Sequence, residues 1–194
     1  MDLSALRPED AQKLLLVIAP RINGHAGEIA KLCGFLPLAL RAAASTLAET
    51  PNLSPADYAR RLVDARRQLK LRDPSSDQTV EASLSLSYEL LKEESRKRFR
   101  LLAVFPESYD ARAAAAVWGM EPDPAQEALG ELLRYSIVDW IEAGQRYQLH
   151  DLVRTYAEGL LKPEERGEAV RRHAAHFVEV AASADDLYLK GGDA

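Results

Sequence analysis

The sequence predicts a mainly α-helical protein. A helical bundle is followed by a second helical module with one short β-hairpin, and a long helix closes the chain. Alanine and leucine are abundant among the 194 residues, and both favour helices. Proline, glycine and capping residues separate apolar segments of helical period. Only the region around Gly144 shows the alternation and the glycine-containing connection that are typical of a hairpin.

Composition and charge limit the classes of function. The formal net charge is −5, whereas a domain that binds a polyanion usually carries a basic surplus, so nucleic acid is disfavoured as a partner. Cys33 is the lone cysteine and cannot form an internal disulfide, which favours a reducing, cytoplasmic setting. No apolar run approaches the roughly 18 residues of a membrane span, so no membrane contact is predicted.

Four helices are expected in a first domain, residues 1–72. Prolines near the start of three of them (Pro8, Pro37 and Pro55) fit the first helical turn, where the missing N–H would have no intrahelical partner. Gly34 ends the second helix, and Ser54 is the expected N-cap of the fourth. The expected segments are 7–19, about 24–33, 37–47 and 55 onward.

The polar, proline-containing stretch 72–77 predicts a linker, and residues 78–162 are expected to form a second domain. Its first segment, Val80–Tyr88, alternates like a strand but also fits one face of a helix, and we interpret it as a helix. Three further helices are expected at 96–104, 110–118 and 123–135.

The hairpin is predicted to pair 137–142 with 146–149 across residues 143–145, and another helix is expected from about His150. Helices followed by a hairpin and a helix form the order of a winged-helix module. The last segment, Pro163 to about Leu189, has apolar residues at helical spacing. It is expected to be a connector helix in a third region, residues 163–194.

Motifs of known chemistry are absent from the sequence. There is no G-x-x-x-x-G-K-[ST] loop to hold a triphosphate, no apolar strand ending in paired acids for magnesium and no G-x-S-x-G or H-E-x-x-H sequence. We therefore predict no catalytic residues and no enzyme activity for this chain. His173 and His176 could share a metal, but without a third ligand we interpret them as a solvated pair. Cys33 is interpreted as a small buried apolar residue rather than a nucleophile.

Two short motifs carry a resemblance to a known family. Residues 33–40, CGFLPLAL, resemble a signature of the NB-ARC family of STAND P-loop ATPases, and residues 149–152, LHDL, look like that family's M-H-D motif at the end of a winged helix. Phe35 stands where many members have a second glycine, and Leu149 replaces methionine. Residues 171–177 resemble the connector that precedes TPR-type repeats in bacterial members.

The resemblance implies two nucleotide contacts. Pro37 would pack against the adenine base, and His150 would contact the β-phosphate of ADP and hold a closed state. Supporting roles fall to Gly34, Leu36 and Leu38 around the proline, and to Asp151, which would cap the following helix or orient His150. The alternative interpretations are that Pro37 only begins a helix and that His150 is only exposed at the exit of the hairpin.

The resemblance also implies partners. ADP or ATP would be held by an N-terminal P-loop domain that these residues do not include, so this chain alone is expected to bind nucleotide weakly or not at all. We expect the chain to be a fragment that starts within a longer signalling protein, rather than a truncated homologue. A C-terminal repeat domain and protein partners are implied as well.

Three functions remain open at this point. The first is a nucleotide-state-sensing switch module. The second is a winged-helix DNA-binding regulator, but its expected recognition helix, residues 123–135, carries Asp123, Glu127 and Glu131 against Arg134 alone, and these acids repel phosphate. The best basic patch, 96–100, is explained by a solvated helix face. The third is a protein-interaction scaffold without nucleotide dependence.

Overall fold

The computed structural model describes residues 5–72 and 78–191. These residues are mainly helical with one two-stranded antiparallel sheet, which confirms the predicted fold class. The described residues form two compact units, one containing residues up to Arg96 with Leu132–Ile137, the other Lys97–Glu131 with residues from Val138 onward. The domain boundaries expected from the sequence rest on a different criterion and stay predictions. Of the expected linker, 72–77, Arg72 is the last helical residue of the fourth helix, and the rest lies outside the described residues.

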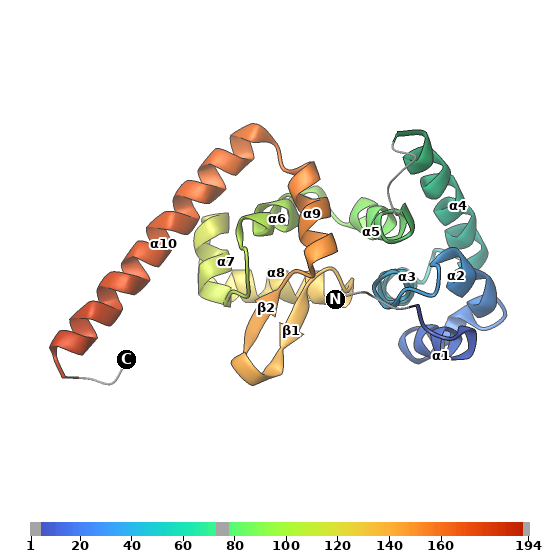
Figure 1. The fold of residues 1–194 in the computed structure, drawn as a ribbon, viewed down its shortest axis with the longest axis horizontal. Coiled ribbons are helices and arrows are strands. Elements are labelled where there is room, and N and C mark those ends of the chain that lie inside the picture. The colour runs from blue at the N-terminus through green and yellow to red at the C-terminus, as the bar shows by residue number, and fades with distance from the viewer. Residues whose placement is uncertain (1–4, 73–77, 192–194) are drawn as a thin grey trace. The chain divides into compact units, whose positions relative to one another are not determined.

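The first unit is built around helix α3. Leu38, Leu40 and Leu47 of α3 are buried, and α3 packs against α1 and α5, while α4 packs against α2 and α5. Burial of these apolar side chains is the main stabilising contribution to the unit. Its elements are α1 (Pro8–Ile18), η1 (Pro20–Ile22), α2 (Ala26–Leu32), α3 (Pro37–Glu49), α4 (Pro55–Arg72) and α5 (Gln78–Leu90) (Figure 1).

The segment that alternates serine and leucine is a helix, α5, as we interpreted it. Ser83 and Ser87 are fully buried, and each hydroxyl donates to the carbonyl one turn earlier. The Ser87 hydroxyl also lies 2.7 Å from that of Thr46 on α3. These bonds satisfy the buried hydroxyl groups, so polar side chains can lie between two closely packed helices without a large desolvation cost.

Arginine side chains cap the C-terminal ends of two helices in the first unit. The Arg21 guanidinium donates to the carbonyl oxygens of Leu47, Thr50 and Leu53 at 2.6–2.9 Å, at and beyond the C-terminal end of α3. Arg66 donates to the carbonyl of Leu32 at the end of α2, at 2.8 Å. The last carbonyl groups of a helix have no intrahelical donor, and a cation is also favoured there by the helix dipole.

The second unit begins within α6 (Glu93–Leu101) and has the element order expected of a winged-helix module. Asp110 caps α7 as predicted, because its Oδ1 accepts the N–H of Ala113 at 2.8 Å. The remaining elements are η2 (Leu102–Val104), α7 (Ala111–Trp118), α8 (Pro122–Arg134, whose last three residues belong to the first unit), β1 (Asp139–Ile141), η3 (Glu142–Gly144), β2 (Arg146–Gln148), α9 (Asp151–Leu160) and α10 (Pro163–Leu189) (Figure 1).

The predicted hairpin is present, with strands shorter than the sequence pattern indicates. Trp140 pairs with Tyr147 in the antiparallel register, and Gln145 closes the connection with a left-handed φ of 48°. Tyr109 adds an isolated bridge to Tyr147, with backbone N···O distances of 2.9 and 2.7 Å. This bridge joins the segment before α7 to the hairpin and fixes the hairpin within the second unit.

Aromatic rings continue this contact into the core of the second unit. Phe105 stacks on Tyr109 with ring centroids 4.4 Å apart, and Tyr109 stacks on Tyr147 at 6.2 Å. Stacked aromatic pairs contribute to stability beyond the apolar area that they bury.

Among the described residues, none of the helices combines the length and the apolar character needed to cross a membrane.

Candidate functional site

A tight turn between α2 and α3 positions Pro37. Gly34 and Phe35 both have left-handed φ angles, 59° and 58°, and the Phe35 N–H donates to the carbonyl of Ala30 at 3.0 Å. Leu36 then returns to extended backbone as the N-cap, and Pro37 is the first residue of α3. The turn therefore presents the proline ring at a helix start.

The residues predicted to support Pro37 shape this turn. A Cβ on Gly34 would lie 3.3 Å from Cγ2 of Thr79 on α5, so the turn approaches α5 closely. Leu38 is buried, whereas Leu36 and Pro37 are half-buried. Part of the proline ring is thus accessible at the surface of the first unit, while the residue that follows it anchors the helix in the core.

Cys33, at the end of α2, is buried and its thiol is unreactive, in agreement with its interpretation as a small apolar residue. Its thiol donates to the carbonyl of Ala39 at 3.6 Å and lies 3.9 Å from the hydroxyl of Ser83. Burial raises the pKa of the thiol to about 12, so almost no thiolate exists at neutral pH.

His150 is the N-cap of α9. Its Nδ1 accepts the backbone N–H of Leu152 at 3.2 Å. A neutral imidazole with Nδ1 as acceptor carries its proton on Nε2, which is then a donor. His150 is half-buried, and the preceding Leu149 is buried and fixes the exit of the hairpin. The ring therefore combines a capping acceptor on one side with a donor on the other.

Asp151 does not supply the helix cap, which was one of the two roles expected of it. The cap that the resemblance implied for Asp151 is supplied by the ring of His150 instead. The Asp151 carboxylate is exposed and pairs with Arg154 at 3.3 Å, and Arg154 also lies 3.6 Å from Glu158. An acid in the first turn of a helix is still favoured by the helix dipole. Asp151 thus contributes charge at the N-terminus of α9.

The two predicted nucleotide contacts lie in separate compact units, Pro37 in the first and His150 in the second. A groove of about 580 Å³ in the second unit contains neither residue. It lies beside the starts of α7 and α8 and the hairpin, and its lining includes Arg112, Asp123 and Trp140. No sequence motif indicates this groove, because its residues come from three separate segments.

His173, one of the two histidines of α10, has aromatic neighbours. His173 lies against Phe105, with ring centroids 5.1 Å apart, and against Phe177, at 4.7 Å. Burial lowers the pKa of His173, and the neighbouring His176 lowers it further. The interpretation as a solvated pair therefore fails for His173, which is half-buried among aromatic rings. No cluster of three or more metal-ligating side chains occurs within 5–72 and 78–191.

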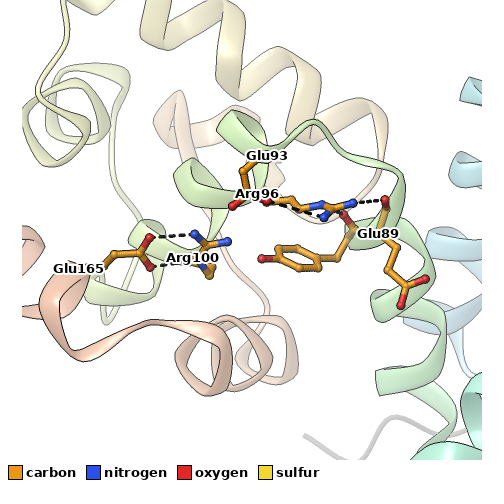
Figure 2. A network of polar contacts seen from close by, with 6 residues as sticks. Glu89, Glu93, Arg96, Arg100 and Glu165 are labelled. Carbon is orange, nitrogen blue, oxygen red and sulfur yellow. Dashed lines mark hydrogen bonds and ion pairs between the residues drawn. The ribbon is translucent and has the colours of Figure 1, made fainter.

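The basic segment 96–100 is not a solvated face at Arg100, and this corrects the expectation from the sequence. Arg100 is 4% exposed and forms a two-bonded ion pair with Glu165 of α10, with N···O distances of 2.8 and 3.1 Å (Figure 2). Arg96 donates to the carbonyl groups of Tyr88, at 3.1 Å, and of Glu89, at the end of α5 (Figure 2). These partners are 7–65 residues away along the chain, so the local charge pattern could not reveal them.

Comparisons with known proteins place the chain beside bacterial regulators. No family model matches it. It is 36% identical over 181 residues to "Regulatory protein AfsR" of Streptomyces griseus, covering 90% of this chain and 18% of that protein. It is 33% identical over 174 residues to a "Putative HTH-type transcriptional regulator" of Mycobacterium tuberculosis, covering 86% of this chain and 19% of that protein.

A plant protein is more distantly similar. The chain is 29% identical over 173 residues to "Disease resistance RPP8-like protein 3" of Arabidopsis thaliana, covering 77% of this chain and 19% of the plant protein. The chain thus spans about a fifth of the length of the curated relatives it matches. It is similar to one segment of larger proteins, among which the bacterial ones are named as regulators.

Proposed function

We propose that this chain is the nucleotide-state-sensing segment of a regulatory switch of the NB-ARC type. In this proposal an upstream P-loop domain holds the nucleotide, while Pro37 contacts the adenine and His150 contacts the β-phosphate of ADP. The observation that carries the proposal is the bonding of His150. Because Nδ1 is occupied by the Leu152 N–H, the Nε2–H is the free donor of a neutral ring at a helix N-terminus, where anions are favoured.

The environment of Pro37 fits a contact with a purine. Its ring is apolar and donor-free, and it is half-buried at the first position of α3. A rigid ring held by a turn loses little conformational entropy when a flat base packs against it. The left-handed pair Gly34 and Phe35 fixes the direction in which the ring is presented.

A switch requires a ligand that stabilises one state more than another. We propose that His150 bonds to the β-phosphate in the ADP state and loses this bond when ATP replaces ADP. Loss of one charge-assisted hydrogen bond is worth about 1.5–3 kcal/mol, which shifts a two-state equilibrium by roughly ten- to a hundredfold. The similarity to proteins named as regulators is in keeping with such a role.

The test uses a longer protein that contains the P-loop domain. We expect the reading frame to encode a Walker A motif within roughly 250 residues before Met1, a distance set by one domain of ordinary size. In that protein ADP should raise the melting temperature. His150→Ser keeps a capping acceptor but removes the Nε2 donor, so it should weaken ADP binding about tenfold or more while leaving the stability without ADP nearly unchanged.

Matched controls are available in the chain. His25 is the N-cap position of α2 but makes no side-chain cap, so His25→Ser should leave ADP binding unchanged. Pro37→Ala should weaken ADP binding, whereas Pro55→Ala, at the first residue of α4, should not. Equal ADP binding by His150→Ser, Pro37→Ala and the two controls would contradict the proposal.

A second candidate is DNA binding through the winged-helix segment, since one relative is named as an HTH-type transcriptional regulator. The exposed acids Asp123 and Glu127 on α8 disfavour it. Fluorescence anisotropy with a labelled duplex separates the two candidates. Micromolar binding that weakens steeply between about 50 and 200 mM salt would favour DNA binding, and our expectation is no binding.

A further inference from the structure

Among the described residues, helix α10 carries most of the large apolar side chains that are exposed. Of the eleven large apolar side chains that are exposed among the described residues, seven lie on α10. Its first half packs against α7 and η2, with Ala169 buried and Arg172 donating to the carbonyl of Val117 at 3.4 Å. From Phe177 to Gly191 every residue is exposed, and the C-terminal half of the helix leads away from α7 (Figure 1).

Six apolar residues of α10 form a continuous exposed line, which we call the α10 seam. Successive members are four, three, four, three and four residues apart, which is the spacing that keeps side chains on one side of a helix that packs against another helix. All six are exposed. The seam consists of Val170, Ala174, Phe177, Ala181, Ala184 and Tyr188.

We propose that the α10 seam pairs with the same seam of a second copy of this chain, in antiparallel orientation about a two-fold axis beside Glu179. In this register the large Phe177 meets the small Ala181 of the second copy at the two central contacts. Ala174 faces Ala184 on either side of them, and Val170 and Tyr188 meet at the two ends. Alternation of large and small residues across facing positions lets two helices interdigitate without voids. A two-fold arrangement closes after two copies.

The charges beside the seam select the antiparallel orientation. On one flank, Arg171 lies opposite Asp185 of the second copy, so the symmetry forms this pair twice, and Val178 meets Val178 at the centre. Within its own chain the exposed Arg171 pairs with Glu168, and such a surface pair is weak. A parallel pairing would instead place Arg171 near Arg166 of the second copy and Phe177 against Phe177, which brings two like charges together and two large rings together.

The length of the seam sets the strength of the contact. Residues 170–188 span about 28 Å of helix, which is two to three heptads and shorter than a stable isolated coiled coil. The interface therefore belongs to the small class, below roughly 1,200 Å². We expect a reversible dimer whose population depends on concentration.

The experiment is sedimentation equilibrium of the 194-residue chain over a range of concentrations, with a matched pair of variants. Ala181→Glu places a carboxylate in the seam, whereas Ala182→Glu places one beside it on the outer surface, and both residues are exposed alanines of the same helix. We expect a monomer–dimer equilibrium that Ala181→Glu weakens at least tenfold and Ala182→Glu less than twofold. Circular dichroism should show equal helix content for both variants.

A charge exchange tests the orientation. Arg171→Asp and Asp185→Arg should each weaken the dimer, and the double variant should restore it, because the exchanged pair again has opposite charges. Crosslinking through Val178→Cys, next to the two-fold axis, should join two copies, since Cys33 is buried and does not compete.

Two outcomes overturn the proposal. A chain that stays monomeric at millimolar concentration, or two alanine variants with equal effects, would show that the seam does not bind a second copy. A double charge variant that is no better than the single ones would overturn the antiparallel register. The pairing does not depend on nucleotide, so its failure leaves the proposed function of Pro37 and His150 standing.

Discussion

His150 differs from the usual N-cap residues because it is an imidazole. Serine, threonine, aspartate and asparagine cap helices with an oxygen that remains an acceptor over the physiological pH range. The His150 cap depends on an unprotonated Nδ1, and a ring that is protonated on both nitrogens cannot accept the Leu152 N–H. The cap and the proposed hydrogen bond to the β-phosphate therefore both use the neutral ring. The cap uses Nδ1 as an acceptor, and the bond to phosphate uses Nε2–H as a donor.

Gly34 should be sensitive to substitution. Gly34→Ala adds a Cβ at a left-handed φ of 59° and at 3.3 Å from Thr79, so we expect a loss of about 1–2 kcal/mol in the free energy of unfolding. Gly159→Ala in α9 is the control, because a Cβ there meets nothing within 4 Å, and it should raise stability by up to about 1 kcal/mol. Urea denaturation measures both, and equal effects would contradict the turn geometry.

Cys33 should resist modification in the folded chain. Its pKa of about 12 and its burial leave little thiolate and no access for a reagent. At pH 8 the thiol should react with a disulfide reagent only as fast as the first unit opens, and immediately in denaturant. Rapid reaction of the native chain would show that this part of the core is open.

At the scale of the elements, helix starts were predictable and several helix ends were not. Pro8, Pro37 and Asp110 mark starts through local chemistry, and the structure places helices there. The Arg21 cap could not be predicted, because its three acceptors lie 26–32 residues away. The N–H donors of a guanidinium can cap the C-terminal end of any helix that the fold brings near. The sequence alone does not indicate which helix an arginine will cap.

The Arg100–Glu165 pair should hold α10 against the rest of the second unit. Both side chains are largely buried, with 5% and 12% exposed. Glu165→Gln removes the negative charge that Glu165 places beside the buried Arg100 guanidinium, so we expect a loss of roughly 3 kcal/mol in the free energy of unfolding. Glu164→Gln, the exposed neighbour, should change stability by less than about 0.5 kcal/mol. Replacing both partners by apolar residues should recover much of the loss.

The same pair predicts a pH dependence. Its hydrogen bonds to Arg100, first among the causes, lower the pKa of Glu165 in the folded chain. The stabilisation is therefore fully present above the carboxyl's unfolded value, about 4.3, and is lost as the pH falls through the lower folded value. Unfolding measured from pH 6 to pH 3 should show a decline that is smaller in Glu165→Gln. Parallel curves for the two proteins would contradict this assignment.

At the scale of the whole molecule, this chain alone should be inactive towards nucleotide. We expect no ATP hydrolysis above the buffer background and an ADP dissociation constant above about 1 mM. The reason is that the sequence has no G-x-x-x-x-G-K-[ST] loop, whose backbone N–H groups would hold the phosphates. Phosphate release and titration calorimetry measure these quantities. Turnover by the purified chain would contradict the proposal that an upstream P-loop domain holds the nucleotide and this chain senses its state.

Of the candidate site, the sequence predicted only the residues that belong to its two motifs. Residues 33–40 and 149–152 indicated Pro37 and His150, and the structure shows a half-buried proline at a helix start and a capping histidine. For Asp151 the expectation was either the cap, since acids are common capping residues, or the orientation of His150. Which neighbour takes the cap depends on backbone dihedrals, since His150 has the extended conformation that a cap requires and Asp151 is already helical.

The length of α10 makes its attachment mechanically important. Glu165 lies in the first turn, and Leu189 is the last helical residue, so the arm between them measures about 36 Å. A tilt of about 10° at the Arg100 contact would displace the far end by roughly 6 Å, for a helix of this rise per residue. A small rearrangement around one ion pair would thus become a movement as large as a turn of helix at the other end.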